Sequence, residues 1–171
     1  MFLLIILLAF VHNTSGQSLL DKLRALYSSA GLQEDSAKKM YDMLKPVTET
    51  SDPVLLCYKG AVTMVQAKFF FNPVTKFGCF VKGKKLVENA ITRDSNNIEM
   101  RYLRFTLQSN LPSFLGYNSQ LKTDKDYLIN HCQLLNNGVL RDMIISFLLA
   151  SKYCNNEDVK KLQHARGSSI G

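Results

Sequence analysis

The sequence has little of what builds β-structure or a recognisable active site. Its 171 residues include no tryptophan, four prolines, nine glycines and three histidines. Few turn-forming residues disfavour a β fold, and no two alternating segments are joined by a hairpin turn. The chain also carries no G-x-S-x-G, Walker or G-x-G-x-x-G pattern. These absences favour long helices and give no signature of nucleotide binding or hydrolase chemistry.

Histidine and cysteine are too scattered to predict a metal or catalytic centre. Beyond the first sixteen residues the histidines are His131 and His164, and no C-x-x-C is present. His131 adjoins Cys132, but neighbouring helix positions point about 100° apart. We therefore predict no metal site, no catalytic residue and no cofactor.

The cysteines are predicted to be free. An even number in an exported chain would usually indicate disulfides. A helical hairpin turning at Asn72, however, would place Cys57 on the order of 10 Å from Cys79, and a turn at Asn137 separates the other pair similarly. Each cysteine has apolar neighbours, so we favour buried thiols over disulfides. The four are Cys57, Cys79, Cys132 and Cys154.

The N-terminus indicates export. Residues 1–11 form an unbroken apolar run, and small residues follow at Thr14 and Gly16. This pattern is typical of a secretory signal peptide, although Lys and Arg are absent from its start. An uncleaved anchor is the alternative, but the run is shorter than the roughly 20 residues of a span. We predict a signal peptide over residues 1–16, a mature chain beginning at Gln17, no stable transmembrane span afterwards, and a periplasmic or secreted protein.

The spacing of apolar residues predicts an all-α fold. We expect a single helical domain over residues 17–171, with about seven helices. Asp52-Pro53 and Asn72-Pro73 each place a capping side chain before a proline, which is a favoured helix start. The core is expected over residues 52–117, around a central apolar helix pair, with C-terminal helices over residues 123–165.

That central pair has distinctive faces. Residues 54–71 are apolar nearly all round, with one polar stripe at Lys59, Thr63 and Gln66, so this helix should be buried. Gly60 inside it should answer a packing need, because glycine costs roughly 1 kcal/mol against alanine in a helix. The apolar face of the next helix is expected at Phe77, Phe80, Val81, Val87 and Ile91.

Charge is unevenly distributed. The net charge is +7, and no Asp or Glu occurs between residues 53 and 87, where six lysines stand. This basic hairpin, residues 59–85, could hold an anionic lipid or small metabolite, or an acidic partner. Alternatively, Glu88, Asp94, Glu99 and the acids of residues 34–42 neutralise it. Nucleic acid fits poorly, since no recognition-helix motif occurs.

Arg101 and Arg104 stand among apolar residues and should be partly buried, so they need charged partners. We predict an ion-paired cluster around Asp94, with Glu99 near, which Tyr58 and Lys59 could join or which could line a pocket. The candidate binding residues are therefore Tyr58, Lys59, Lys68, Lys82, Lys85, Glu99, Arg101 and Arg104.

Residues 82–97, KGKKLVENAITRDSNN, resemble the second helix of a tetratricopeptide repeat and the turn after it. Gly83 and Ala90 stand at the small-residue positions, whereas Ser95 stands where that family normally has proline. The resemblance implies tetratricopeptide-like packing of helix pairs and, more loosely, protein binding.

Residues 56–117, with LCYKGA, ENAITRDSNNIEMRYLRF and LPSFLGY, are similar to a group of small exported all-α bacterial proteins without an assigned function. Some of these relatives are labelled adenylosuccinate lyase. The residues here do not support that label, because the flexible signature loop of the lyase is missing. An enzyme of lyase type therefore rests on the label alone.

Three hypotheses follow. The first is a non-catalytic, exported helical binding or scaffold protein of the cell envelope. The second is a module that binds an anionic lipid or small metabolite through the basic hairpin. The third is an enzyme. Full internal pairing of Tyr58, Lys59, Arg101 and Arg104, with an apolar surface groove elsewhere, would favour protein binding. A pocket that gathers these residues with unpaired charge would favour the module.

Overall fold

A computed structural model describes residues 19–167, and every regular element in this range is helical. The predicted signal peptide lies outside the described residues. The all-α prediction is confirmed, with eight α-helices in this range where about seven were expected. They are α1 (residues 19–30), α2 (Glu34–Met43), α3 (Pro53–Gln66), α4 (Pro73–Arg93), α5 (Ile98–Asn110), α6 (Leu121–His131), α7 (Gly138–Ala150) and α8 (Asn156–Gly167).

Side-chain caps start the central helices where the sequence predicts them. The Asp52 carboxylate accepts from the backbone N–H of Val54 at 2.8 Å, and Asn72 caps α4 in the same way. Each cap satisfies an amide that has no partner within its own helix. The predicted extent of the central apolar helix, residues 54–71, is too long, however. The helix α3 ends at Gln66, and a short 3₁₀ turn, Ala67–Phe69, follows it.

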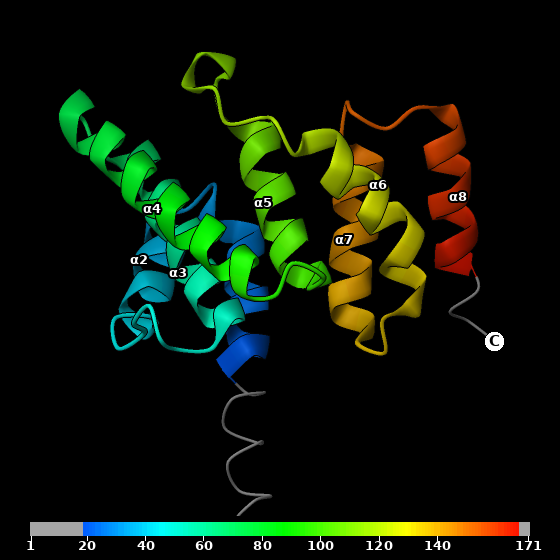
Figure 1. Ribbon diagram of the computed structural model, residues 1–171, viewed down its shortest axis with the longest axis horizontal. Helices are drawn as coiled ribbons and strands as arrows, with labels where there is room; N and C mark the ends of the chain where they lie inside the picture. The colour runs from blue at the N-terminus through cyan, green and yellow to red at the C-terminus, as the bar shows by residue number, and fades with distance from the viewer. Residues whose placement is uncertain (1–18, 168–171) are drawn as a thin grey trace, which may run out of the picture.

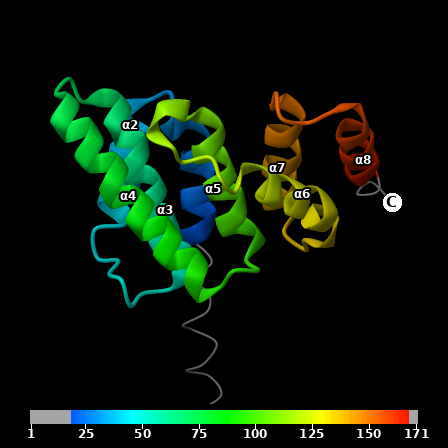
Figure 2. The ribbon, with the colours of Figure 1, turned by 45° about the horizontal axis from the view of Figure 1, so that its top comes forward.

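The described chain forms a single domain with two buried apolar clusters (Figure 1). The first cluster is built mainly from α1–α5, and the second from α5–α8. Figure 2 shows α5 between the two groups of helices. The core is therefore larger than the expected residues 52–117, since Leu23 and Met40 before that range and Ile144 and Leu148 after it are fully buried.

The α3–α4 hairpin owes its close packing to two glycines. A Cβ atom at Gly60 would lie 2.7 Å from the Gly83 carbonyl oxygen, and one at Gly83 would lie 2.6 Å from the Gly60 carbonyl oxygen. The two backbones are therefore nearly in contact, which confirms that Gly60 answers a packing need. Glycine gives this close approach at some cost in helix propensity.

The predicted apolar face of α4 is only partly correct. Phe80, Val87 and Ile91 are buried, but Phe77 and Val81 are 59% and 49% exposed. Every residue from 70 to 78 is exposed, because the start of α4 extends beyond the helices that cover its second half. In Figures 1 and 2 this end stands clear at the upper left. Helical periodicity predicts which side of α4 is apolar, but it does not show how far the neighbouring helices extend along that side.

None of the helices in the described part of the chain is both long and apolar enough to cross a bilayer.

Candidate functional site

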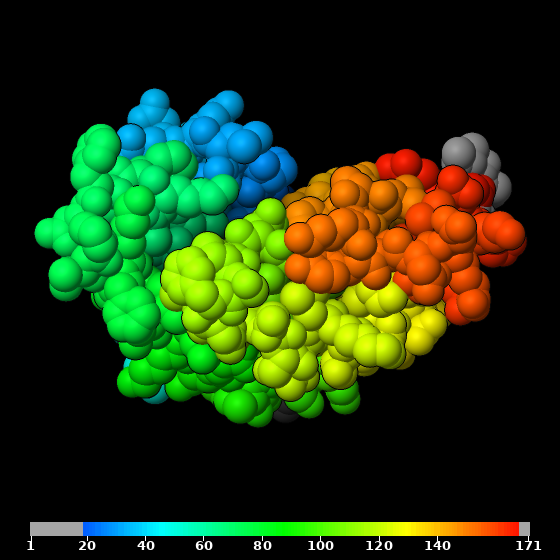
Figure 3. Space-filling model, turned by 90° about the horizontal axis from the view of Figure 1, so that it is seen from above, coloured from blue at the N-terminus to red at the C-terminus, as the bar shows by residue number. Residues whose placement is uncertain are grey.

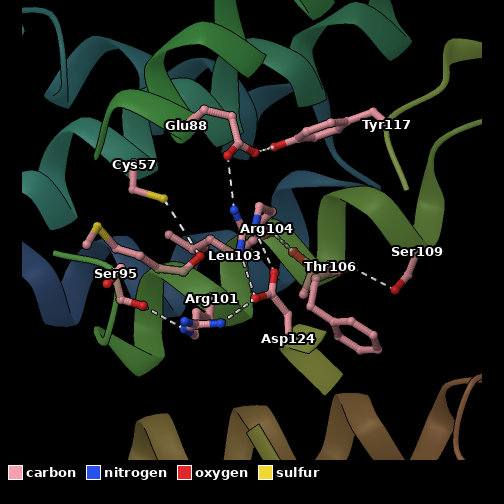
Figure 4. Close-up of polar contacts among 12 residues, drawn as sticks. Cys57, Glu88, Ser95, Arg101, Leu103, Arg104, Thr106, Ser109, Tyr117 and Asp124 are labelled. Atoms are coloured by element: carbon pink, nitrogen blue, oxygen red, sulfur yellow. Dashed lines mark hydrogen bonds and ion pairs between the residues drawn. The ribbon is translucent and has the colours of Figure 1, made fainter. Parts of the chain in front are cut away.

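A buried ionic cluster joins α4, α5 and α6 around Asp124, in the first turn of α6. The Asp124 carboxylate is fully buried and takes two hydrogen bonds from Arg104, at 2.7 and 2.8 Å. Arg101 reaches the same carboxylate at 3.0 Å. Figure 4 shows Arg104 between Asp124 and Glu88, which it contacts at 3.0 Å. Tyr117 donates to the other oxygen of Glu88. We call these five residues the Asp124 cluster.

The prediction that Asp94 lies at the centre of this cluster is wrong. Asp94 follows the last residue of α4 and accepts from the Asn97 side chain at 3.2 Å, as part of the turn into α5. Arg101 and Arg104 instead point from α5 toward α6. Arg101 also donates to the Ser95 carbonyl at 2.7 Å and lies 4.2 Å from the centre of the Tyr127 ring. Both arginines are thus paired, as predicted, but with a carboxylate further along the chain.

Tyr58 and Glu99 belong to a second buried cluster, with Arg24 of α1. The Arg24 guanidinium binds both oxygens of Glu99, at 2.8 and 2.7 Å, and the Tyr58 hydroxyl donates to one of them at 2.7 Å. This two-pronged pairing is the geometry that suits a guanidinium and a carboxylate best. The Arg24 cluster, Arg24, Tyr58 and Glu99, therefore joins α1, α3 and α5.

The four candidate lysines do not meet at one site. Lys59 donates to the carbonyls of Lys45 and Val47 before α3, and Lys68 donates to the Gly31 carbonyl at 3.0 Å. Lys85 lies 3.5 Å from Glu49, while Lys82 is exposed on α4. The predicted binding set is therefore divided among the two buried clusters, two backbone contacts and an exposed basic surface.

The electrostatics of the clusters favour fixed charges over proton transfer. Hydrogen bonding to Glu99 raises the pKa of Arg24, so the guanidinium stays charged. Burial, and next the charge of Glu99, raises the pKa of Tyr58, and burial with the Glu88 hydrogen bond raises that of Tyr117. These phenols stay neutral at physiological pH and donate to carboxylates. The contacts within the two clusters can therefore fix the positions of the joined helices relative to one another.

Cysteine and histidine side chains form no cluster within residues 19–167. All four cysteines are free, as predicted. Cys57 and Cys132 are buried, whereas Cys79 and Cys154 are partly exposed, so the predicted burial holds for two of the four. Within residues 19–167, no three His, Cys, Asp or Glu side chains gather closely enough to hold a metal ion.

The thiols should differ in reactivity. Burial raises the pKa of all four thiols, but only Cys57 and Cys132 are buried enough to restrict access by a reagent. We expect N-ethylmaleimide to label Cys79 and Cys154 of the native protein well before Cys57 and Cys132, as followed by peptide mass mapping. Labelling in urea, where all four should react, is the control. Early native labelling of Cys57 would contradict the packing around α3.

A third feature is an exposed apolar surface at the start of α4. Val74, Phe77 and Val81 repeat at helical spacing on one side, and Phe70 and Phe71 precede them. Phe71 is 99% exposed and Val74 79%. We call these five residues the apolar tip. Lys76 lies within this exposed stretch, and Lys82 is exposed further along the same helix. Large exposed aromatic side chains that gather in one place indicate an interaction surface.

Sequence reasoning missed Arg24, Glu88, Tyr117 and Asp124 as members of the clusters. Asp124 stands in a first helical turn, where an acid is explained by the helix dipole alone. Arg24 is one of several charges along α1. Its only sequence signal is its position next to the apolar residue Leu23, which is fully buried in the structure. Such a position suits a partly buried charge that needs a partner.

Comparisons with known proteins give no assignment: no family model, curated protein or solved structure matches this chain.

Proposed function

We propose that this protein is a non-catalytic, exported binding or scaffold domain of the cell envelope, and that its partner docks on the apolar tip. One observation carries the proposal. The buried arginines have carboxylate partners inside the fold, while five large apolar side chains at the start of α4 remain exposed. Buried charges that already have partners inside the fold offer little to a ligand.

The form of the tip suits a protein partner. An aromatic anchor that fills a pocket on the partner is a common source of binding energy at interfaces. Phe71 and Phe77 can serve as such anchors, because both rings face solvent. The lysines beside them match a partner whose pocket has an acidic rim.

The α3–α4 hairpin gives further support for a scaffold role. Gly60 and Gly83 bring the two helices close together, as the resemblance to a tetratricopeptide repeat implies, and Gly83 is one of the residues that carry that resemblance. Proteins built from stacked helix pairs commonly bind other proteins. The resemblance of residues 56–117 to small exported bacterial proteins is in keeping with the proposed export.

Site-specific photo-crosslinking tests the docking surface. We would replace Phe71 with benzoylphenylalanine in cells and compare it with the same substitution at Leu134, which is 71% exposed but lies outside the tip. We expect a protein adduct at position 71 that position 134 does not give. Phe77→Ser, introduced together with the probe, should reduce that adduct several-fold. The proposal fails if the two positions give the same adducts.

Export is tested separately, by fractionation and mass measurement. We expect to find the protein outside the cytoplasm, with the mass of a chain whose first residue is Gln17, because small residues precede that position. A mass that still includes residues 1–16 would contradict cleavage, and a cytoplasmic location would contradict export itself.

A second candidate function is binding of an anionic lipid or metabolite by the basic hairpin. It is favoured by the absence of any acid between residues 53 and 87 and by the exposure of Lys76 and Lys82. Lipid adducts at position 71, together with sedimentation on anionic but not zwitterionic vesicles that Lys82→Glu weakens, would favour this function over protein binding.

A further inference from the structure

A pocket of about 310 Å³ lies between α1, α3, α5 and α7, away from the apolar tip. It stands where the two apolar clusters meet, since Met64 belongs to the first cluster and Phe147 to the second. Figure 3 shows the hollow between the blue N-terminal helices and the orange α7. The volume is at the small end of the range of ligand sites in proteins, about 300–1,000 Å³.

The walls of this pocket are mainly apolar. Met64 and Val65 of α3, Leu107 and Leu111 at the end of α5, and Phe147 of α7 supply them. Phe147 is held in place by an edge contact with Tyr102, whose ring centre lies 5.9 Å away. Such a lining favours a hydrocarbon body over a sugar or nucleotide, which would leave its polar groups unpaired.

The polar groups inside the pocket are already bonded. The Tyr27 hydroxyl and the Thr106 hydroxyl lie 2.6 Å apart, and Thr106 donates to the Leu103 carbonyl. Thr106 therefore accepts its bond from Tyr27, which leaves the Tyr27 hydroxyl no hydrogen to offer a ligand. These groups specify no polar ligand in the interior of the pocket.

The single charge among the lining residues is at Lys68. Its ammonium donates to the Gly31 carbonyl at 3.0 Å, which fixes it at the pocket and leaves two of its three N–H groups for another acceptor. The lining includes no Asp or Glu, so this charge is not neutralised within the pocket. Asn110, also in the lining, donates to the Thr106 carbonyl through its side-chain nitrogen.

From this arrangement we propose that the pocket binds a medium-chain fatty acid, with the hydrocarbon chain between α3, α5 and α7 and the carboxylate at Lys68. One lysine matches a singly charged head group, whereas a phosphate would bring close to two charges. The small volume favours a medium chain over a long one. This site does not depend on the proposed docking function of the apolar tip.

Calorimetry with octanoate and octan-1-ol tests the proposal, since the two share a chain length and differ in charge. We expect the purified full chain to bind octanoate with a Kd below about 1 mM and octanol more weakly. Lys68→Gln should weaken octanoate binding roughly tenfold, because it removes a charged hydrogen bond, and should leave octanol unchanged. Lys38→Gln removes the same charge from an exposed position on α2, outside the pocket, and should change neither.

A second variant tests the pocket itself. Val65→Phe places a larger side chain in the space for the hydrocarbon chain and should abolish binding of both ligands. Lys68 is exposed, so its variant keeps the test valid even if Val65→Phe fails to fold. The proposal is overturned if octanoate does not bind at about 10 mM, if octanol binds as tightly as octanoate, or if the two lysine variants lose octanoate equally.

Discussion

Replacing Gly83 with alanine should destabilise the protein by about 3 kcal/mol, although alanine is the better helix former. The new Cβ would lie 2.3 Å from the Met64 side chain and 2.6 Å from the Gly60 carbonyl oxygen. Met64 can turn away, but the backbone oxygen can move only if α3 moves. Inserting a methyl group into a packed site costs about 1–3 kcal/mol, and occasionally more. Urea unfolding followed by circular dichroism at 222 nm measures the change.

Gly78 of the same helix provides a matched control. A Cβ there meets no atom within 4 Å, and the residue is exposed. Gly78→Ala should therefore stabilise the protein by about 1 kcal/mol, through helix propensity alone. Opposite signs at the two glycines would show that close packing of α3 and α4 is the cause. A similar gain at both positions would contradict the close approach of the two helices.

Asp124→Asn should cost about 3–5 kcal/mol of unfolding free energy. This substitution keeps the shape of the side chain but removes the carboxylate charge that Arg101 and Arg104 share. Arg104 is itself buried, and in this variant Glu88 is its one remaining carboxylate partner. The loss reflects the buried positive charge that remains more than the value of the pair itself. Thermal and urea unfolding measure it.

Asp126→Asn is the matched control on α6. Asp126 pairs with the exposed Lys122 at 2.6 Å, and exposed pairs contribute up to about 1 kcal/mol. Its removal should therefore change stability far less than that of Asp124. A double variant, Arg104→Met with Asp124→Leu, should recover part of the stability, since apolar residues can replace a buried ion pair. Equal effects at Asp124 and Asp126 would contradict a buried cluster.

Together these variants separate fold from function. Asp124 lies outside the apolar tip and the lining of the pocket, so its substitution should act on binding only through unfolding. Gly83→Ala also displaces Met64, which lines the pocket, so Asp124→Asn is the cleaner variant for fold alone. Phe71→Ser, by contrast, removes a side chain that is 99% exposed and should change stability by less than about 0.5 kcal/mol. Loss of partner binding in that variant would therefore report on the docking surface itself.

The candidate site was only partly predictable. Burial and pairing of Arg101 and Arg104 follow from their apolar neighbours, because a buried charge needs a partner wherever it lies. The choice of Asp124 over Asp94 does not follow, because it depends on how α6 returns against α5. The basic hairpin was visible in the sequence, but its lysines separate in space, with Lys68 at the pocket and Lys82 on the exposed surface.

The starts of the central helices and the burial of α3 could be predicted from the amino-acid sequence alone. Helix starts at Asp52 and Asn72 depend on a side chain and amides within three residues of it, so they can be recognised without the fold. Burial of α3 follows from its nearly continuous apolar surface. The exposure of Phe77 and Val81, and the pocket where the two apolar clusters meet, could not be predicted in this way. Both outcomes depend on how far neighbouring helices extend, which is set by packing between distant segments.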